Sequence, residues 1–160
     1  MKYYKIIIAL IILLYSCEQD TICIEETTPH LIIRFYNETD HSKLREVVNL
    51  KVSVENSLDE LVEIVSIVDT DSIAIPLNVD LDYTKIYLSK NTSETTGIGI
   101  NDEFTINYDR KDVYVSRSCG YKTIYSNIST TNVSDNWMES ISVIFTEINN
   151  ENQAHLKIFH

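Results

Sequence analysis

The sequence predicts an all-β fold, an antiparallel β-sandwich or open barrel of about eight or nine short strands. Three observations lead to this prediction. Apolar and polar residues alternate with a period of two in several segments, no segment shows a long helical stripe, and polar turn residues recur between the alternating segments. With only three glycines and two prolines in the chain, Asn, Asp, Ser and Thr take over the turns. The 160 residues, 44% of them hydrophobic, indicate one folded domain.

The first element is a leader. Lys2 and Lys5 precede an unbroken apolar run over residues 6–14, the length of a secretory signal and too short for a membrane span. The run ends in Leu14-Tyr15-Ser16-Cys17, which resembles the lipobox of bacterial lipoproteins, with Tyr15 departing from the usual small residue. We therefore expect a lipoprotein signal peptide over 1–16, a lipidated tether over 17–29 and a single β-sandwich domain over 30–160. The competing interpretation is ordinary cleavage near Ser16 that leaves a free Cys17.

Lipidation would place fatty acyl chains, palmitate among them, on Cys17. Several chains on one cysteine hold a protein on a membrane stably, whereas one chain binds only marginally. The expected partner is thus a membrane, contacted through lipid on Cys17, while a protein or glycan partner is not identifiable from the sequence.

In the first half of the domain, Leu31–Tyr36 is predicted to be a strand, followed by a polar loop over 37–45. Leu50, Val52 and Val54 alternate with polar residues and predict a strand with one solvated face. Residues 57–68 are ambiguous between a helix and a loop followed by a short strand, and the β-branched residues favour the strand.

The second half continues with the clearest alternation of the chain, Ile73 to Leu81, in which Pro76 requires a sheet edge or a bulge. Ile86–Leu88 is a further short strand. Three longer predictions follow: a hairpin of 104–108 and 113–115 around a turn at 109–112, an extended segment over 121–128 before a polar connection to 136, and a strand over 141–145 that turns at 149–152 and returns over 156–159.

The number of cysteines, three, fits an exported lipoprotein in which one cysteine is acylated and the other two can form a disulfide. If Cys17 is acylated, Cys23 and Cys119 remain as one pair in an oxidising compartment. A bridge between them would close a loop of about 97 residues, worth up to about 4.7 kcal/mol in the chain-entropy model. The alternative is two unpaired buried thiols. Two cysteines cannot form a structural zinc site alone, and no histidine lies at ligand spacing from either.

The charge of the chain is strongly acidic, −11 in total. Removal of residues 1–16 takes away two lysines and leaves 11 basic and 24 acidic side chains, a charge of −13. Such a protein is expected to avoid nucleic acid and anionic lipid headgroups.

No motif predicts catalysis or a cofactor. Asn78, Asp80 and Asp82 resemble the start of a calcium loop, but the glycine and the final glutamate of that loop are missing, and one solvent face of a strand explains them equally well. The histidines are expected to be isolated surface residues: His30, His41, His155 and His160. Four aromatic residues could line a sugar- or peptide-binding groove or form cross-strand and core contacts: Tyr114, Tyr121, Tyr125 and Trp137.

Four segments together resemble a family of uncharacterised lipoproteins, a domain of unknown function from Bacteroidota-type bacteria. They are SCEQDTIC at 16–23, TPHLIIRFYN at 28–37, DSIAIPLNVDLDYT at 71–84 and DEFTINYDRKDVYVSRSCGY at 102–121. The resemblance implies a β-rich cell-envelope protein without assigned chemistry. It supports lipidation of Cys17, pairing of Cys23 with Cys119 and the extended interpretation of residues 62–68.

The sequence therefore predicts a non-enzymatic structural or binding module, lipid-anchored in the cell envelope. The expected membrane is the outer membrane, with the domain facing the periplasm or the cell surface. The alternative is a secreted soluble ligand-binding protein, with carbohydrate as one candidate ligand.

Overall fold

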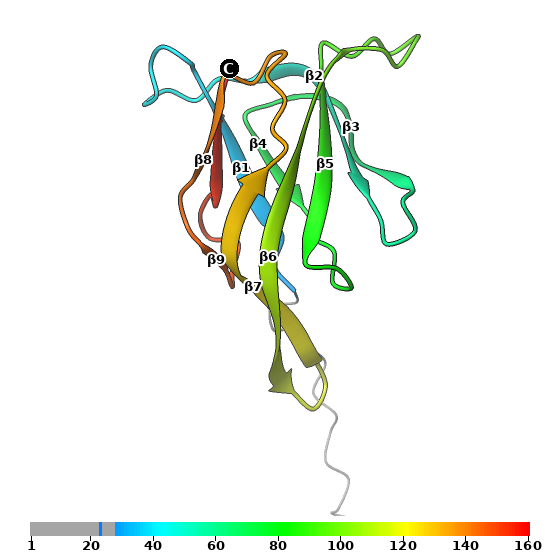
Figure 1. The fold of residues 1–160 in the computed structure, drawn as a ribbon, viewed down its shortest axis with the longest axis vertical. Coiled ribbons are helices and arrows are strands. Elements are labelled where there is room, and N and C mark those ends of the chain that lie inside the picture. The colour runs from blue at the N-terminus through cyan, green and yellow to red at the C-terminus, as the bar shows by residue number, and fades with distance from the viewer. Residues whose placement is uncertain (1–22, 24–27) are drawn as a thin grey trace, which may run out of the picture.

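The computed structural model describes Cys23 and residues 28–160, which fold into two β-sheets packed face to face (Figure 1). The all-β sandwich prediction is confirmed, with ten strands in place of eight or nine and no helix among the described residues. The strands are β1 (Leu31–Tyr36), β2 (Val47–Glu55), β3 (Leu61–Thr70), β4 (Ser72–Ile75), β5 (Tyr83–Lys90), β6 (Ile100–Ser116), β7 (Gly120–Thr131), β8 (Ser140–Val143), β9 (Glu147–Ile148) and β10 (Leu156–Phe159).

The smaller sheet has the order β4-β1-β10-β8. β1 and β10 run parallel, with Phe35 opposite Ile158, and the other two pairs are antiparallel. The first and last strands of the domain therefore lie side by side at the centre of this sheet, so that neither can leave it without breaking two ladders.

The larger sheet has the order β3-β2-β5-β6-β7-β9 and is antiparallel throughout. Its longest pair, β6 and β7, reaches beyond its neighbours. β5 pairs with β6 only from Ile100 to Asn107, and β9 pairs with β7 only at Tyr125 and Ser126. The remainder of the pair forms a two-stranded hairpin that projects from one end of the sandwich (Figure 1).

Alternating side chains from both sheets fill the space between them. Leu31, Ile33 and Phe35 of β1 are buried, and they face apolar residues of the larger sheet. Among the fully buried members from that sheet are Leu50, Val52, Ile86, Leu88, Phe104, Ile106 and Tyr125. This period of two is the pattern expected of strands with one face in a core.

Asparagine supplies most of the left-handed backbone that the few glycines cannot. Asn49 and Asn127 have φ of 47° and 55° and lie at register shifts of β2 and β7. Asparagine tolerates this region better than other non-glycine residues. In the hairpin turn the same need is met by Gly120, at φ 72°. The predicted replacement of glycine by polar turn residues is confirmed.

The predictions for residues 57–68 and for Ile73 to Leu81 have different outcomes. The favoured interpretation of residues 57–68, a loop followed by a strand, is confirmed, although β3 spans ten residues and is longer than the predicted strand. Its turn is closed by Asn56, whose Oδ1 accepts the N–H groups of Leu58 and Glu60 at 2.9 and 3.0 Å. The strand predicted from Ile73 to Leu81 ends at Ile75, immediately before Pro76, and it lies at the edge of its sheet as the proline requires.

Two predicted hairpins also differ. The turn predicted at residues 109–112 does not exist, because these residues pair with Ser126 to Thr123 of β7 and the chain reverses at 117–119. The strand predicted over 141–145 ends at Val143, after which the chain crosses to the larger sheet as β9. The predicted antiparallel pairing of this strand with the last one is confirmed.

Candidate functional site

A disulfide joins the start of the described chain to the end of the projecting hairpin. Cys23 is bonded to Cys119 in the turn between β6 and β7, with Cα atoms 5.0 Å apart. A second contact lies nearby, where the N–H of Thr123 donates to Thr28 Oγ1 at 3.0 Å. The segment before β1 is therefore fastened to the hairpin, whereas Cys17, the predicted lipidation site, lies outside the described residues.

A mostly apolar cleft of about 390 Å³ opens beside the disulfide. It lies between the segment before β1, the loop after β4 and the hairpin. Its lining residues are Cys23, Thr28, Pro29, His30, Pro76, Leu77, Val79, Val115, Cys119, Tyr121 and Lys122. At its edge the ring of His30 contacts Glu151, with Nδ1 and Oε1 2.5 Å apart. Hydrogen bonds from the His30 backbone and ring lower the pKa of Glu151. The lining of the cleft suits a small apolar group, with the His30–Glu151 pair at its edge.

The four candidate aromatic residues do not form one groove. Tyr114 and Tyr121 are cross-strand partners on the hairpin, with ring centroids 5.4 Å apart, and they are 55% and 70% exposed. Tyr125 is fully buried, and burial raises its pKa to about 12. Trp137 packs against Phe35. Its backbone N–H donates to the carboxylate of Asp102, near the start of β6 and far from the tyrosine pair. Of these four residues, Tyr114 and Tyr121 are the two that are largely exposed.

The candidate calcium ligands have other partners. Asn78, Asp80 and Asp82 lie in the loop between β4 and β5 and not on one strand face. Asn78 Oδ1 accepts the N–H groups of Asp80 and Leu81, and Asp82 accepts a hydrogen bond from Arg110 at 2.8 Å. Among Cys23 and residues 28–160, no three His, Cys, Asp or Glu side chains are grouped to hold a metal ion.

Two histidines correct the expectation of surface positions, because His155 and His160 are 1% and 3% exposed. His155 Nδ1 accepts the N–H of Ile32 at 2.9 Å, so this nitrogen carries no proton. Burial lowers the pKa of both residues. Their roles are structural: each completes hydrogen bonds at the ends of the smaller sheet.

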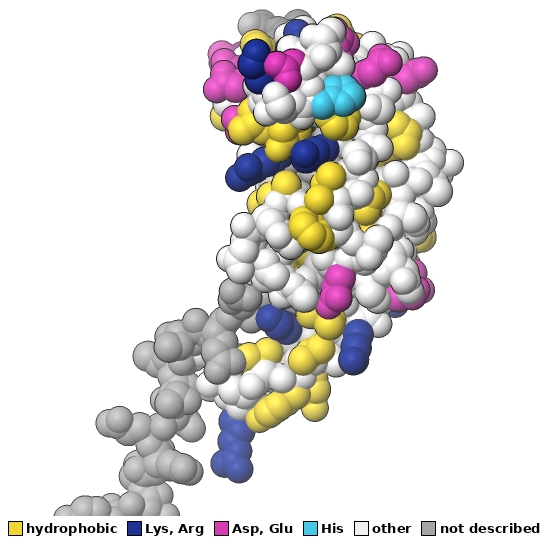
Figure 2. Space-filling view, turned by 90° about the vertical axis from the view of Figure 1, so that its left-hand side faces the viewer, with side chains coloured by type: hydrophobic (Ala, Val, Ile, Leu, Met, Phe, Trp, Pro, Cys, Tyr) yellow, Lys and Arg dark blue, Asp and Glu magenta, His cyan; other side chains and the backbone are white. Residues whose placement is uncertain are grey.

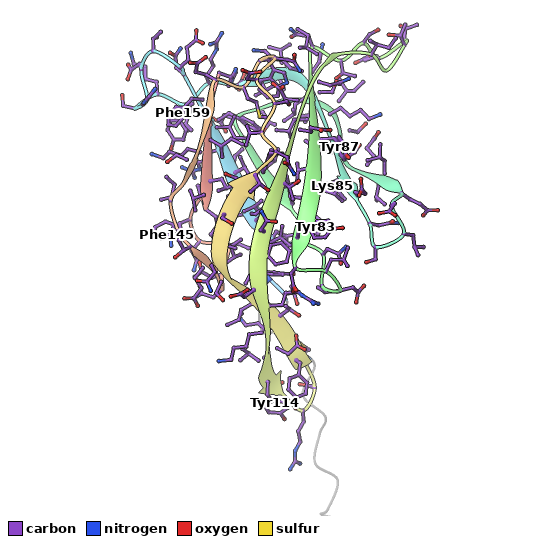
Figure 3. The ribbon with its side chains drawn as sticks, in the orientation of Figure 1. Tyr83, Lys85, Tyr87, Tyr114, Phe145 and Phe159 are labelled. Atoms are coloured by element: carbon purple, nitrogen blue, oxygen red, sulfur yellow. A yellow bond between two sulfur atoms is a disulfide. The ribbon has the colours of Figure 1, made fainter. Side chains whose placement is uncertain are left out.

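A polar cluster on the outer face of the larger sheet was not predicted. Glu55 of β2 accepts hydrogen bonds from Lys85 at 2.5 Å and Tyr87 at 3.0 Å, both on β5. Hydrogen bonding to Lys85 lowers the pKa of Glu55, and the same contact raises that of Lys85. Figure 3 shows Tyr83, Lys85 and Tyr87 along β5. The alternation of Tyr83, Lys85 and Tyr87 could have indicated that they share one face of a strand. Their partner Glu55 lies 30 residues before Lys85 and could not be found from this alternation.

A buried carboxylate was also missed. Asp102 is 2% exposed and accepts hydrogen bonds from Ser134 Oγ and from the N–H groups of Asn136, Trp137 and Met138, at 2.6 to 2.8 Å. Burial alone would raise its pKa, but these four donors outweigh burial and lower it. With every oxygen engaged by the loop after β7, Asp102 holds that loop in place and has no free lone pair directed at a cavity.

No helix within the described part of the chain is long and apolar enough to cross a bilayer. Comparison with curated proteins gave no significant match, and comparison with solved structures gave none either. A family model does match, over residues 49–160, from the middle of β2 to the end of β10. This chain belongs to the family of unknown function DUF6452.

Proposed function

We propose that this protein is a lipid-anchored module of the bacterial cell envelope, attached to its membrane through acylated Cys17. The sequence Leu14-Tyr15-Ser16-Cys17, at the end of a secretory apolar run, carries this proposal. The disulfide supports it, because Cys23–Cys119 is a bond expected of exported proteins. The expected membrane is the outer membrane.

The proposed role at the membrane is structural or binding, and not enzymatic. Three side chains that could do acid–base chemistry are engaged in structure: Asp102 holds a loop, Glu55 is bound to Lys85 and Tyr87, and His155 accepts a backbone hydrogen bond. General acid–base catalysis requires such a group to reach a substrate proton. The surfaces that we propose for binding are the apolar cleft and the tyrosine pair.

The test is the fate of position 17. The full-length protein should fractionate with membranes and yield, after proteolysis, an N-terminal peptide that begins at Cys17 and carries fatty acyl mass. The Cys17→Ala variant should be released into the soluble fraction. A Ser16→Ala variant, which keeps a small residue before the cysteine, is the matched control and should remain on the membrane. Membrane association of the Cys17→Ala variant would contradict the proposal.

The alternative is a secreted soluble protein that binds a small ligand, and the cleft of about 390 Å³ favours it, since this volume falls within the range of ligand pockets. The same mass spectrum separates the two functions. An unmodified N-terminus near Ser16, with the protein in the soluble fraction, would support the alternative.

A further inference from the structure

The hairpin tip, residues 111–122, differs in charge from the rest of the molecule. It contains three basic residues, Lys111, Arg117 and Lys122, against the single acidic Asp112. The whole chain has a net charge of −11, so the remainder is strongly acidic. Figure 2 shows Lys, Arg and hydrophobic side chains gathered on this projecting end. The net charge of the protein therefore does not describe the surface at its tip.

The exposed groups of the hairpin tip are those that proteins place at a membrane–water interface. Tyr114 and Tyr121 lie side by side and are largely exposed. Figure 3 places Tyr114 at the far end of the hairpin. Tyrosine is enriched at the headgroup level, where its ring and hydroxyl meet different surroundings. Lys111 and Arg117 are exposed too, and neither forms a salt bridge with any described residue.

The disulfide limits how far this tip can lie from the proposed anchor. Cys17 lies six positions before Cys23, and a fully extended chain spans at most about 3.6 Å per residue. The acylated residue is thus held within about 22 Å of Cys23, which is bonded to Cys119 in the turn of the tip. By contrast, Asp102 lies 14 residues from Ser116 along β6, about 45 Å away at the usual strand rise.

We infer that the hairpin tip contacts the phospholipid headgroups and sets the orientation of the sandwich, with the β6–β7 hairpin pointing at the membrane and the acidic body away from it. This inference rests on the proposed lipid anchor. The occupant is a bilayer surface: the tyrosine pair enters the interface, and Lys111 and Arg117 contact lipid phosphates. Each basic residue near an anionic surface favours this orientation, and the acidic body opposes the reverse one.

The test uses tryptophan emission from the full-length lipidated protein. The protein is placed in phosphatidylethanolamine vesicles containing a minority of phosphatidylglycerol, with or without a lipid brominated near the headgroup. Tryptophan introduced by Tyr114→Trp should lose roughly half of its added emission to the brominated lipid. The Tyr83→Trp variant is the matched control, since Tyr83 is an exposed tyrosine of the same sheet that pairs with Asn107 of β6. Neither it nor the natural Trp137 should be quenched.

Flotation of the vesicles separates failure of the anchor from failure of the orientation. Wild-type protein that floats while Tyr114→Trp emission is no more quenched than Tyr83→Trp emission would overturn the orientation and leave the anchor intact. Protein that does not float would overturn both. Equal strong quenching at both positions would also overturn the inference, because the sandwich would then lie on its side.

A charge variant sharpens the result. Combining Lys111→Gln and Arg117→Gln with Tyr114→Trp should lower the ratio of docked to undocked tips roughly thirtyfold in the anionic vesicles. Flotation should be unchanged. Both replaced side chains are exposed, so the unfolding midpoint should match that of the parent protein. Unchanged quenching in this variant would show that the basic residues do not contact lipid, and would overturn that part of the inference.

Discussion

The strand pair β6–β7 has an inner half within the sandwich and an outer half that projects as the hairpin. Both halves share the same two strands and the same ladder, yet they are stabilised in different ways. In the half within the sandwich, Phe104, Ile106 and Tyr108 are at most 3% exposed, and neighbouring strands flank the pair. In the projecting half, the two strands have no further neighbours, and Tyr114 is 55% exposed. A two-stranded hairpin is marginally stable on its own.

The comparison shows that one strand can belong to the core at one end and to a covalently held appendage at the other. The Cys23–Cys119 bond and the Thr123–Thr28 hydrogen bond join the projecting half to the segment before β1. We therefore expect the inner half to determine the global stability of the fold, and the projecting half to contribute a surface whose order depends on the disulfide.

The largest difference between the halves should come from truncating one aromatic residue in each. Phe104→Ala should lower the free energy of unfolding by about 3–5 kcal/mol, because it leaves a cavity between the sheets. Tyr114→Ala should cost less than about 1 kcal/mol, the range of a cross-strand pair. Urea unfolding followed by far-ultraviolet circular dichroism measures both. A loss at Tyr114 equal to that at Phe104 would mean that the projecting half is part of the core.

A carboxylate in each half allows a second comparison. Asp102→Ala should cost about 3 kcal/mol, because three backbone N–H groups and the Ser134 hydroxyl lose their acceptor. Asp112 accepts the Thr123 hydroxyl at 2.8 Å and is exposed. Asp112→Ala, the matched control, should cost less than about 0.5 kcal/mol. The measurement is the midpoint of urea unfolding, compared between variants for which the free energy of unfolding depends equally on the urea concentration.

Protonation of Asp102 at low pH should destabilise the fold, as the Asp102→Ala substitution does. Its folded-state pKa is lowered below the ordinary value of 3.8. The stabilisation is therefore complete above that ordinary value and is lost as the pH falls below it, when the unfolded chain binds the proton more readily. If Asp102→Ala and wild type lost stability equally over this range, the carboxylate would not be the group responsible.

Removing the disulfide should have a smaller global effect. The double variant Cys23→Ala with Cys119→Ala should lower the free energy of unfolding by about 1–2 kcal/mol, less than half of the chain-entropy limit of about 4.7 kcal/mol. The reason is that the released tip and segment also gain freedom in the folded state. Hydrogen exchange should accelerate much more at amides of residues 111–123 than at those of Phe104 and Ile106, which should accelerate only by the factor that the lower global free energy of unfolding gives. Uniform acceleration would contradict the proposed independence of the two halves.

The same contrast explains which parts of the fold could be predicted from the sequence. Where one face is buried, as in Leu31–Tyr36 and from Phe104 to Tyr108, alternation correctly predicted the strands. Where neither face is buried, alternation stops carrying information. Residues 109–112 therefore resemble a turn although they continue β6. Beyond Pro76, alternation persisted to Leu81 without a partner strand, so it overpredicted β4.

The candidate site shows a similar division. With Cys17 assigned to lipidation, Cys23 and Cys119 remained as the expected pair, and the disulfide of the structure confirms this pairing. The cleft beside them needed the positions of three segments that are far apart in the sequence. Asp102 and His155 were beyond prediction, since a polar residue in an alternating segment is assigned to the solvent face unless its buried hydrogen-bond partners are known.

The smallest expected effect is a pH dependence that belongs to the body of the sandwich alone. Burial lowers the folded-state pKa of His155 and His160 below the ordinary 6.5, and the hairpin tip contains no histidine. Since the folded state binds these protons less readily than the unfolded chain does, the stabilisation is complete above the unfolded pKa and declines as the pH falls below it. Between about pH 7.5 and about pH 5.5, the decline should be a fraction of the 1.4 kcal/mol per pH unit that a full proton would give.

A variant assigns this pH dependence to one residue. His155→Gln should be less stable at both pH values, because it disturbs the hydrogen bond from Ile32, but it should show a shallower pH dependence than wild type. His41→Gln is the control, since His41 is exposed and its ring contacts the Glu38 carbonyl at 3.0 Å. Hydrogen exchange at residues 111–123 should not follow the histidine titration. If exchange there rose in parallel with the loss of global stability, the tip would unfold only together with the body, and the two halves of the hairpin would form one cooperative unit.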